Sequence, residues 1–306
     1  MIKKISSFIQ NHFGITFLAL VCCALWRPNV FSPLQNHAEN LLMGALFLGY
    51  LKIEFGEFSH LRANAIKIFA LSIASITLLP ICVFLLVFWL PLPTALGLTM
   101  IAAAPGAMMS PLIAGMWNLR VLWTSIYVII TSILLPLTFP YVILILFGSK
   151  IEISALDMSL FLAKMIIIPS VLAFVFKKIS RTMAQKISDN SGAIGTLCIA
   201  FFVAIIVASN RDFLLMGFSK LQTFASLGLM ILLFLFCFCI GYLIPTQEKR
   251  EKLTNCLMFG CMNNGIVIIV ASKFFSPEVQ LVLLLSEIPW SFSLPLFRRF
   301  LIRSEF

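Results

Sequence analysis

The stretch 103–112 reads AAPGAMMSPL and lies inside a longer run, Thr94 to Met116, that is otherwise apolar enough to cross a membrane. Proline lacks a backbone N–H and its ring clashes with the preceding helical turn, so Pro105 predicts that a helix is interrupted here. A second interruption, GCMNNG at 260–265, falls near the centre of another apolar run. We therefore expect two membrane helices that are each broken near the middle.

The composition of the chain is that of a membrane protein. Of its 306 residues, 61% are hydrophobic and 11% are charged, and the mean hydropathy is +1.05. Apolar runs of about 18 residues or more, which signal transmembrane helices, recur along the whole chain. We predict a single all-α integral membrane domain over residues 1–306, in the inner (cytoplasmic) membrane and in contact with the lipid bilayer. The basic start precedes an apolar run with no small-x-small cleavage pattern, so we interpret this run as the first span.

Ten membrane spans are predicted along the chain. Their approximate limits are 14–27, 39–53, 65–90, 94–116, 119–147, 158–176, 193–209, 223–244, 253–274 and 279–301. With the N-terminus inside, the cytoplasmic segments hold 16 lysines and arginines and the outer segments hold 5, while Lys164 lies within a span. Because cytoplasmic loops carry an excess of basic residues, this bias predicts that both termini are cytoplasmic.

An internal repeat relates the two halves of the chain. SILLPL at 132–137 and SFSLPL at 291–296 share the pattern S-x-x-L-P-L, 159 residues apart, and a shift of 158 residues places Pro105 on Asn263. Five spans in each half would make the second half enter the membrane from the opposite side, which is the inverted-topology repeat of many secondary transporters. Since the shared pattern is short, a chance match is the alternative.

The two breaks predict a polar site inside the membrane. Lipid cannot satisfy the backbone groups that a broken helix leaves unpaired, so these groups must face protein or a water-filled cavity. Half-helix N-termini favour anions and free carbonyls favour cations. We expect left-handed backbone at Gly106 and within 263–265, which glycine and asparagine adopt at low cost. The predicted substrate-binding residues are Pro105, Gly106, Ser110, Asn263, Asn264 and Gly265. The alternative is that each break is a simple kink.

Over nearly its full length the chain resembles the bile acid:sodium symporter superfamily. The matching segments are GYLKIEFGEFSHL at 49–61, SITLLP at 75–80, APGAMMS at 104–110, SILLPLTFP at 132–140, NRD at 210–212 and GCMNNG at 260–265. The resemblance implies ten transmembrane helices in two inverted five-helix repeats, approximately 1–147 and 158–306, with broken helices four and nine crossing at mid-membrane. It also implies a panel of spans 1–2 and 6–7, a core of spans 3–5 and 8–10, and transport of organic anions, usually with sodium.

The sequence departs from this family where the resemblance places sodium ligands. Carboxylate, amide or hydroxyl groups are missing or changed at Ser75, Pro111, Val128, Met258 and Met262. The residual ion-site positions are Ser110, Thr124, Met258 and Met262. Sodium needs hard oxygen ligands, and the thioether of methionine is soft. We therefore expect weak or no sodium dependence, and no other cofactor.

Two charged side chains within predicted spans are candidates for coupling. Lys164 in span six either supplies a tethered cation or extends to the outer surface, since a lysine at membrane depth is costly to bury. Glu287 in span ten carries a proton, pairs with a lysine, or sits at a wet outer interface. By contrast, the run from Glu248 to Lys252 is expected to be a solvated cytoplasmic loop.

These observations favour transport over other classes of function. The eight cysteines fall within predicted spans without metal-ligand spacing, so we expect no metal site. The net charge of +10 is explained by cytoplasmic loops, so no nucleic-acid partner is expected. Nothing resembles a catalytic triad or a P-loop, so we expect no enzyme. We predict a secondary transporter whose partner is a small organic solute, an organic anion or polar metabolite, working by alternating access. The alternatives are a sodium-independent permease or exporter of the arsenite-exporter or auxin-carrier type, and a non-transporting membrane receptor of the same fold. No oligomeric state is favoured.

Overall fold

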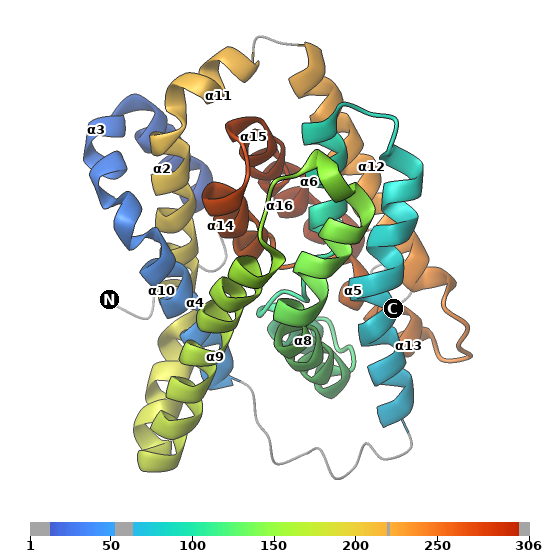
Figure 1. The fold of residues 1–306 in the computed structure, drawn as a ribbon. Coiled ribbons are helices and arrows are strands. Elements are labelled where there is room, and N and C mark those ends of the chain that lie inside the picture. Colours follow the sequence, from blue (N-terminus) through green and yellow to red (C-terminus); the bar gives the residue numbers. More distant parts are fainter. Residues whose placement is uncertain (1–12, 53–63, 219–220, 300–306) are drawn as a thin grey trace. The chain divides into compact units, whose positions relative to one another are not determined.

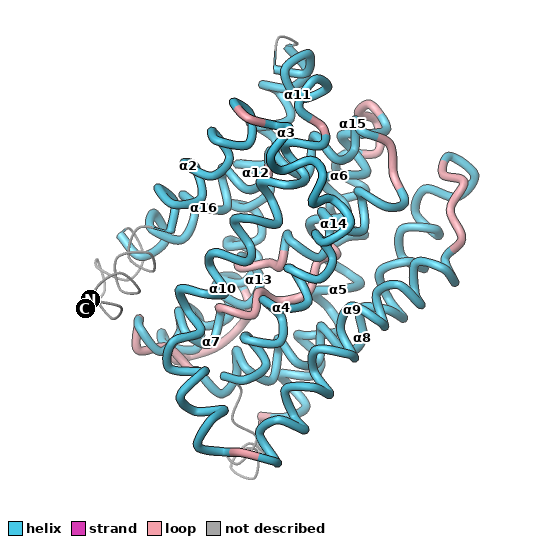
Figure 2. The backbone as a smooth tube through the Cα atoms, turned by 90° about the vertical axis from the view of Figure 1, so that its left-hand side faces the viewer, coloured by secondary structure: helices cyan, strands magenta, loops and turns pink. Residues whose placement is uncertain are grey.

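The computed structural model describes residues 13–52, 64–218 and 221–299, which form helices joined by short loops (Figures 1 and 2). The chain divides into two compact units that are each built from two segments. The first unit comprises Met1–Glu54 and Ala163–Ser219, and the second comprises Phe55–Leu162 and Lys220–Phe306.

The first unit is organised around one long helix. Its elements are α2 (Phe13–Trp26), α3 (Pro28–Phe31), η1 (Ser32–His37), α4 (Ala38–Lys52), most of α9 (Ala155–Ile179), α10 (Arg181–Ser209) and α11 (Arg211–Phe218). Helix α10 packs against α4 and α2, and the Ser180 side chain caps its start by accepting from the Met183 N–H. Helix α10 begins well before the predicted limit of span seven, so Ser191 is buried within it rather than in a loop.

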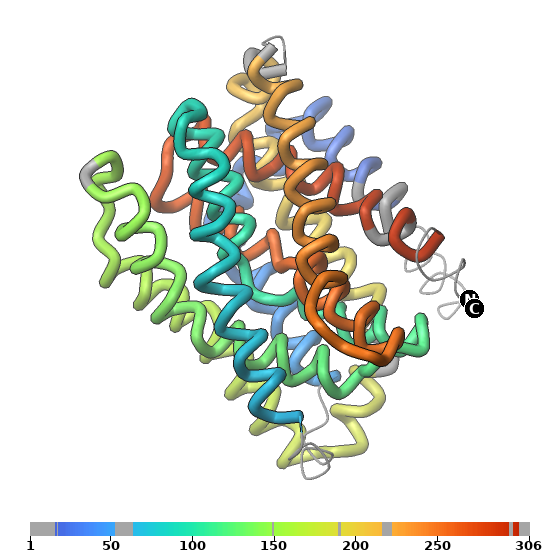
Figure 3. Tube along the Cα trace, turned by 90° about the vertical axis from the view of Figure 1, so that its right-hand side faces the viewer, coloured from blue at the N-terminus to red at the C-terminus, as the bar shows by residue number. Residues whose placement is uncertain are grey.

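The second unit contains the two predicted breaks. Its further elements are α5 (Ala65–Val87), α6 (Leu92–Ala102), α7 (Ser110–Met116), α8 (Val121–Phe147), η3 (Gly148–Lys150), α12 (Leu221–Leu243), α13 (Lys249–Gly260), α14 (Asn264–Phe274), α15 (Pro277–Leu285) and α16 (Glu287–Phe297). Helix α5 packs along α8 and α12 packs along α13 (Figure 3). The contact between α12 and α13 needs a glycine at position 241, because a Cβ there would lie 2.5 Å from the Asn255 carbonyl oxygen.

The helices are those of a multi-pass membrane protein. Five helices in the described part are long and apolar enough to cross a membrane: Ala65–Val87, Val121–Phe147, Ala155–Ile179, Ser191–Ser209 and Gln222–Leu243. Two shorter apolar helices, α6 and α14, lie beside the predicted breaks. The prediction of an all-α integral membrane protein is confirmed, whereas the count of ten spans and the inverted repeat stay predictions.

Two helix boundaries differ from those expected. Span ten is itself divided at Ser286, between α15 and α16. Pro289 lies four residues after Leu285, whose carbonyl its ring would meet in a regular helix, and this disfavours continuation through Ser286. The run expected to be a cytoplasmic loop is also helical, because α13 begins at Lys249. Part of the segment 49–61 lies outside the described residues.

Candidate functional site

The two predicted breaks are real and they pair with each other. The residues between α6 and α7, 103–109, and those between α13 and α14, 261–263, form what we call the crossing. The Ala107 N–H donates to the Cys261 carbonyl at 2.9 Å, and the Asn263 N–H donates to the Pro105 carbonyl at 2.8 Å. Backbone groups that the helix ends leave unpaired are thus satisfied across the crossing. The alternative of two simple kinks is therefore wrong.

Gly106 is required at the crossing for a different reason from the one expected. Positive φ angles occur in the described residues only at Asn118 and Gly148, so the expected left-handed backbone at Gly106 and 263–265 is wrong. Instead, the ring of Tyr127 covers Gly106 so closely that a Cβ there would lie 2.7 Å from Tyr127 Cε1. Glycine is needed here because of this close approach.

Two side chains of α8 that the sequence reasoning missed hold the crossing in place. Thr131 Oγ1 accepts a hydrogen bond from the Gly106 N–H at 3.1 Å and lies 2.8 Å from the Tyr127 carbonyl, to which it donates. Tyr127 is buried, stacks on Phe259 with ring centroids 6.5 Å apart and hydrogen bonds with Ser75. Residues 127 and 131 are one helical turn apart in an apolar span, but this spacing is common in membrane helices and did not mark either residue as part of a site.

Ser110 lies at the first position of α7, within the second half-helix as predicted. Its side chain is fully buried and faces the thiol of Cys261, a weak partner, but its hydroxyl makes no other hydrogen bond among the described residues. Buried polar atoms in folded proteins nearly always have a partner, which is often a water or a ligand. The Ser110 hydroxyl is therefore available to such a group.

Asn264 and Glu287 come together where α14 meets the break between α15 and α16. The Asn264 amide nitrogen donates to Ser286 Oγ at 3.1 Å, and its side chain also contacts the Glu287 carboxyl. The Asn264 amide oxygen has no partner among the described residues. Glu287 is only 5% exposed, so it does not sit at a wet interface. The salt bridges of the described part do not include it.

The residual ion-site positions Thr124, Met258 and Met262 are apolar or internally bonded. Met258 and Met262 are buried, and Thr124 donates its hydroxyl to the Val121 carbonyl of its own helix at 2.8 Å. Asn255, one turn before Met258, is fully buried, and neither polar atom of its amide has a partner in the described part. No group of three or more His, Cys, Asp or Glu side chains in that part could hold a metal ion.

The remaining predicted residues are placed differently. Asn263 immediately precedes α14 and is half-buried, as is Gly265 in its first turn. Lys164 is exposed on α9 and belongs to the first unit, whereas the crossing belongs to the second. A lysine side chain can extend to the membrane surface only if its aliphatic stem is exposed, as it is at Lys164.

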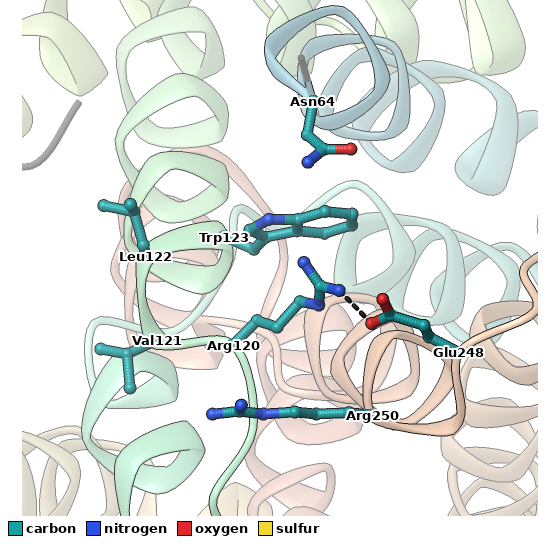
Figure 4. Close-up of a pocket in the computed structure, with 7 residues that line it drawn as sticks. All are labelled: Asn64, Arg120, Val121, Leu122, Trp123, Glu248 and Arg250. Carbon is teal, nitrogen blue, oxygen red and sulfur yellow. Dashed lines mark hydrogen bonds and ion pairs between the residues drawn. The ribbon is translucent and has the colours of Figure 1, made fainter. Parts of the chain in front are cut away.

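A second polar feature lies where α5, α8 and α13 begin. A pocket of about 520 Å³, which we call the end pocket, is lined by Asn64, Arg120, Val121, Leu122, Trp123, Glu248 and Arg250 (Figure 4). Arg120 pairs with Glu248 and lies 4.0 Å from Glu251. Glu251 is 8% exposed and pairs with Lys67 of α5. The expected loop is therefore a helix, although Glu248, Lys249 and Arg250 are exposed as expected. The two acidic residues tie the first turn of α13 to α5 and α8.

Comparisons with known proteins point to one family of membrane transporters. The family model described as Sodium Bile acid symporter family matches residues 41–216, which include the first break and α8. The chain is also similar to the "Uncharacterized sodium-dependent transporter YocS" of Bacillus subtilis (strain 168), at 23% identity over 288 residues. That similarity covers 90% of this chain and 86% of the relative.

Proposed function

Because the chain belongs to the sodium bile acid symporter family, and is therefore a secondary transporter of a small solute in a membrane, we propose that it moves an organic anion or small polar metabolite by alternating access. The observation that carries this proposal is a set of buried polar side-chain atoms on the two broken helices that have no oxygen or nitrogen partner among the described residues. These atoms belong to Ser110, Asn255 and Asn264. Such atoms are costly unless water or a solute reaches them.

We assign ten spans to the chain, with both termini in the cytoplasm of an inner membrane. The first compact unit would be the panel, with spans 1–2 and 6–7, and the second the core, with spans 3–5 and 8–10. The end pocket supports this count, because it brings together the starts of α5, α8 and α13. Three helices that start at one end of a bundle must be separated by even numbers of crossings. The assignment provides two crossings between the start of α5 and the start of α8, and four between the start of α8 and the start of α13.

The solute site is proposed to lie beside the crossing. Helix α14 has 11 residues and begins at Asn264, and its N-cap residue Asn263 makes no capping side-chain hydrogen bond. The N–H groups of such a helix start attract a carboxylate or sulfate. The Ser110 hydroxyl and the Asn264 amide would supply neutral hydrogen bonds to the rest of the solute. This arrangement favours a small anion that also carries hydroxyl or amide groups.

We propose that coupling uses a proton on Glu287 in place of sodium. A buried carboxylate without a cation is unfavourable unless it is protonated, and Glu287 is buried beside Asn264. A proton taken up there neutralises the site and admits an anion on the neighbouring helix start. Lys164 is proposed to extend to the membrane surface and to take no part in coupling.

Flux in proteoliposomes tests the proposal. Carboxylates and organic sulfates would first be screened by thermal shift on the purified protein, with and without sodium, and the best ligand used in radiolabelled form. We expect saturable uptake that the double change Asn263→Leu/Asn264→Leu abolishes while expression is retained. The matched control is Asn29→Leu, at an exposed position of α3, which should transport normally. Ligand binding without any flux would instead favour a receptor.

A further inference from the structure

The end pocket gathers the N-termini of three helices. Asn64 is the N-cap of α5, Arg120 that of α8 and Glu248 that of α13, and none of the three side chains caps its own helix. These helices have 23, 27 and 12 residues. The first backbone N–H groups of a helix lack partners and carry partial positive charge, so three such ends at one pocket favour an anion.

The arginines of the pocket have bonding capacity to spare. Arg250 bonds only to neutral oxygens, Asn118 Oδ1 at 3.3 Å and the Leu119 carbonyl at 3.1 Å, and has no salt bridge among the described residues. Arg120 pairs with Glu248, yet its Nε is buried and has no hydrogen-bond partner among the residues that the structure describes. The lining side chains thus hold two positive charges against one negative charge (Figure 4).

An aromatic ring fixes one of these arginines in place. The Arg120 guanidinium lies over the Trp123 ring, 4.7 Å from its centroid, and the Trp123 ring lies between Asn64 and Arg120 in the view of Figure 4. Stacking on an aromatic face holds a guanidinium in one orientation and leaves its N–H edge for an acceptor. The planar guanidinium fork matches the oxygens of a phosphate group.

We propose that the end pocket binds the phosphate group of an anionic membrane lipid. Arginines and helix N-termini are the groups that bind phosphate in proteins, and basic pockets at the ends of membrane helices bind acidic lipid headgroups. The surroundings favour a lipid over a free phosphate. Apolar side chains at the starts of α5 and α8 are exposed, as contact with lipid acyl chains would require: Ile66 is 83% exposed, Phe69 53% and Val121 43%.

The roles of the two arginines differ in a way that can be tested. Arg120 holds α8 to α13 through Glu248, so its removal would also loosen the fold. Arg250 has no ionic partner in the described part of the chain, so Arg250→Gln removes a phosphate ligand at little structural cost. Glu248 competes with the phosphate for Arg120, so Glu248→Gln frees that guanidinium and should tighten binding. A gain in affinity cannot result from misfolding.

Lipid affinity of the whole purified protein in neutral detergent tests the proposal, with thermal stabilisation as the measurement. The probes are short-chain phosphatidylglycerol, short-chain phosphatidylcholine and inorganic phosphate, at constant ionic strength. We expect phosphatidylglycerol to bind best, about fivefold more weakly to the Arg250→Gln variant and several-fold more tightly to Glu248→Gln. The control Arg181→Gln removes an exposed arginine from the start of α10 and should bind as the wild type does.

Three results would overturn the proposal. The first is wild-type affinity in the Arg250→Gln variant. The second is unchanged or weaker affinity in Glu248→Gln. The third is that inorganic phosphate or phosphatidylcholine stabilises the protein as strongly as phosphatidylglycerol, because the pocket would then serve free phosphate or lipid of any charge.

Discussion

Replacing Gly106 by alanine should destabilise the protein, although the same change normally stabilises a helix. The added Cβ would lie 2.7 Å from Tyr127 Cε1, 2.9 Å from Tyr127 Cδ1 and 3.1 Å from Val128 Cγ2. Overpacking of this kind costs about 1–3 kcal/mol of unfolding free energy. With about 2–4 °C per kcal/mol for a domain of this size, the melting temperature should fall by roughly 2–12 °C.

Gly228 provides the matched control for this change. It lies within α12, and a Cβ there would meet nothing within 4 Å. Gly228→Ala should therefore stabilise the helix by up to ~1 kcal/mol, since alanine has the higher helix propensity. Both variants would be measured by thermal unfolding in the same detergent, with aggregation followed by size-exclusion chromatography.

A double variant shows whether the tyrosine ring is the cause. Tyr127→Leu removes the atoms that the new methyl group would strike, so Gly106→Ala should cost less in that background than in the wild type. The coupling between the two changes should be about 0.5–3 kcal/mol, as for residues in direct contact. If the Gly106→Ala protein has a melting temperature equal to or above that of the Gly228→Ala protein, the close packing of the Tyr127 ring on Gly106 is refuted. Additive effects in the double variant would refute it as well.

Three further predictions follow from the structure and from the proposed mechanism. Lys67→Glu and Glu251→Lys should each lower the unfolding free energy by about 1–3 kcal/mol, because the Glu251 side chain is only 10% exposed. The double swap should recover most of this loss. Equal losses in all three proteins, measured by thermal melting, would contradict the ion pair. In a cysteine-free background, Thr182→Cys should react with a membrane-impermeant reagent only from the cytoplasm and Ser276→Cys only from outside, both positions being exposed; the opposite labelling would invert the assigned topology. Uptake in proteoliposomes should be nearly equal in sodium and choline buffers, and the Glu287→Gln variant should show uptake that no longer depends on an imposed proton gradient. A steep, saturable rise of uptake with sodium would instead point to a cation site that includes Glu287.

The breaks were predictable from the sequence because their causes are local. Pro105 removes a backbone donor and Gly106 directly follows it, a pair that disfavours a continuous helix more than the single prolines inside α5, α8 and α9 do. The position of Ser110 in the next half-helix follows from chain order. The pairing of the breaks depends on how distant segments meet, as in the bond from the Asn263 N–H to the Pro105 carbonyl. The repeat aligned these two positions, yet it did not predict that they would bond. A third break at Ser286 had its own local signal in Pro289, which was overlooked.

The parts of the site that the sequence did not predict all involve contacts between helices. Tyr127 looked like one more aromatic residue in an apolar span, and only its position over Gly106 gives it a function. Glu251 stood in a charged run typical of a loop, but Lys67 lies 184 residues away in the chain and neutralises it. The helix dipole also favours an acidic residue, such as Glu251, in the first turn of a helix. Local composition therefore predicted a loop where tertiary pairing stabilises a helix.

The expected loss of sodium ligands near the crossing would have a simple electrostatic consequence under the proposed mechanism. A carboxylate at position 258 would need a cation nearby at all times, and methionine there removes that need. Glu287 places a carboxylate on α16 instead, against Asn264 at the start of α14. The charge then faces the helix end proposed to receive an anion, so a deprotonated Glu287 repels the solute and a protonated one admits it. Occupancy by proton and by solute would thus be linked through one side chain, which is the thermodynamic requirement for coupled transport.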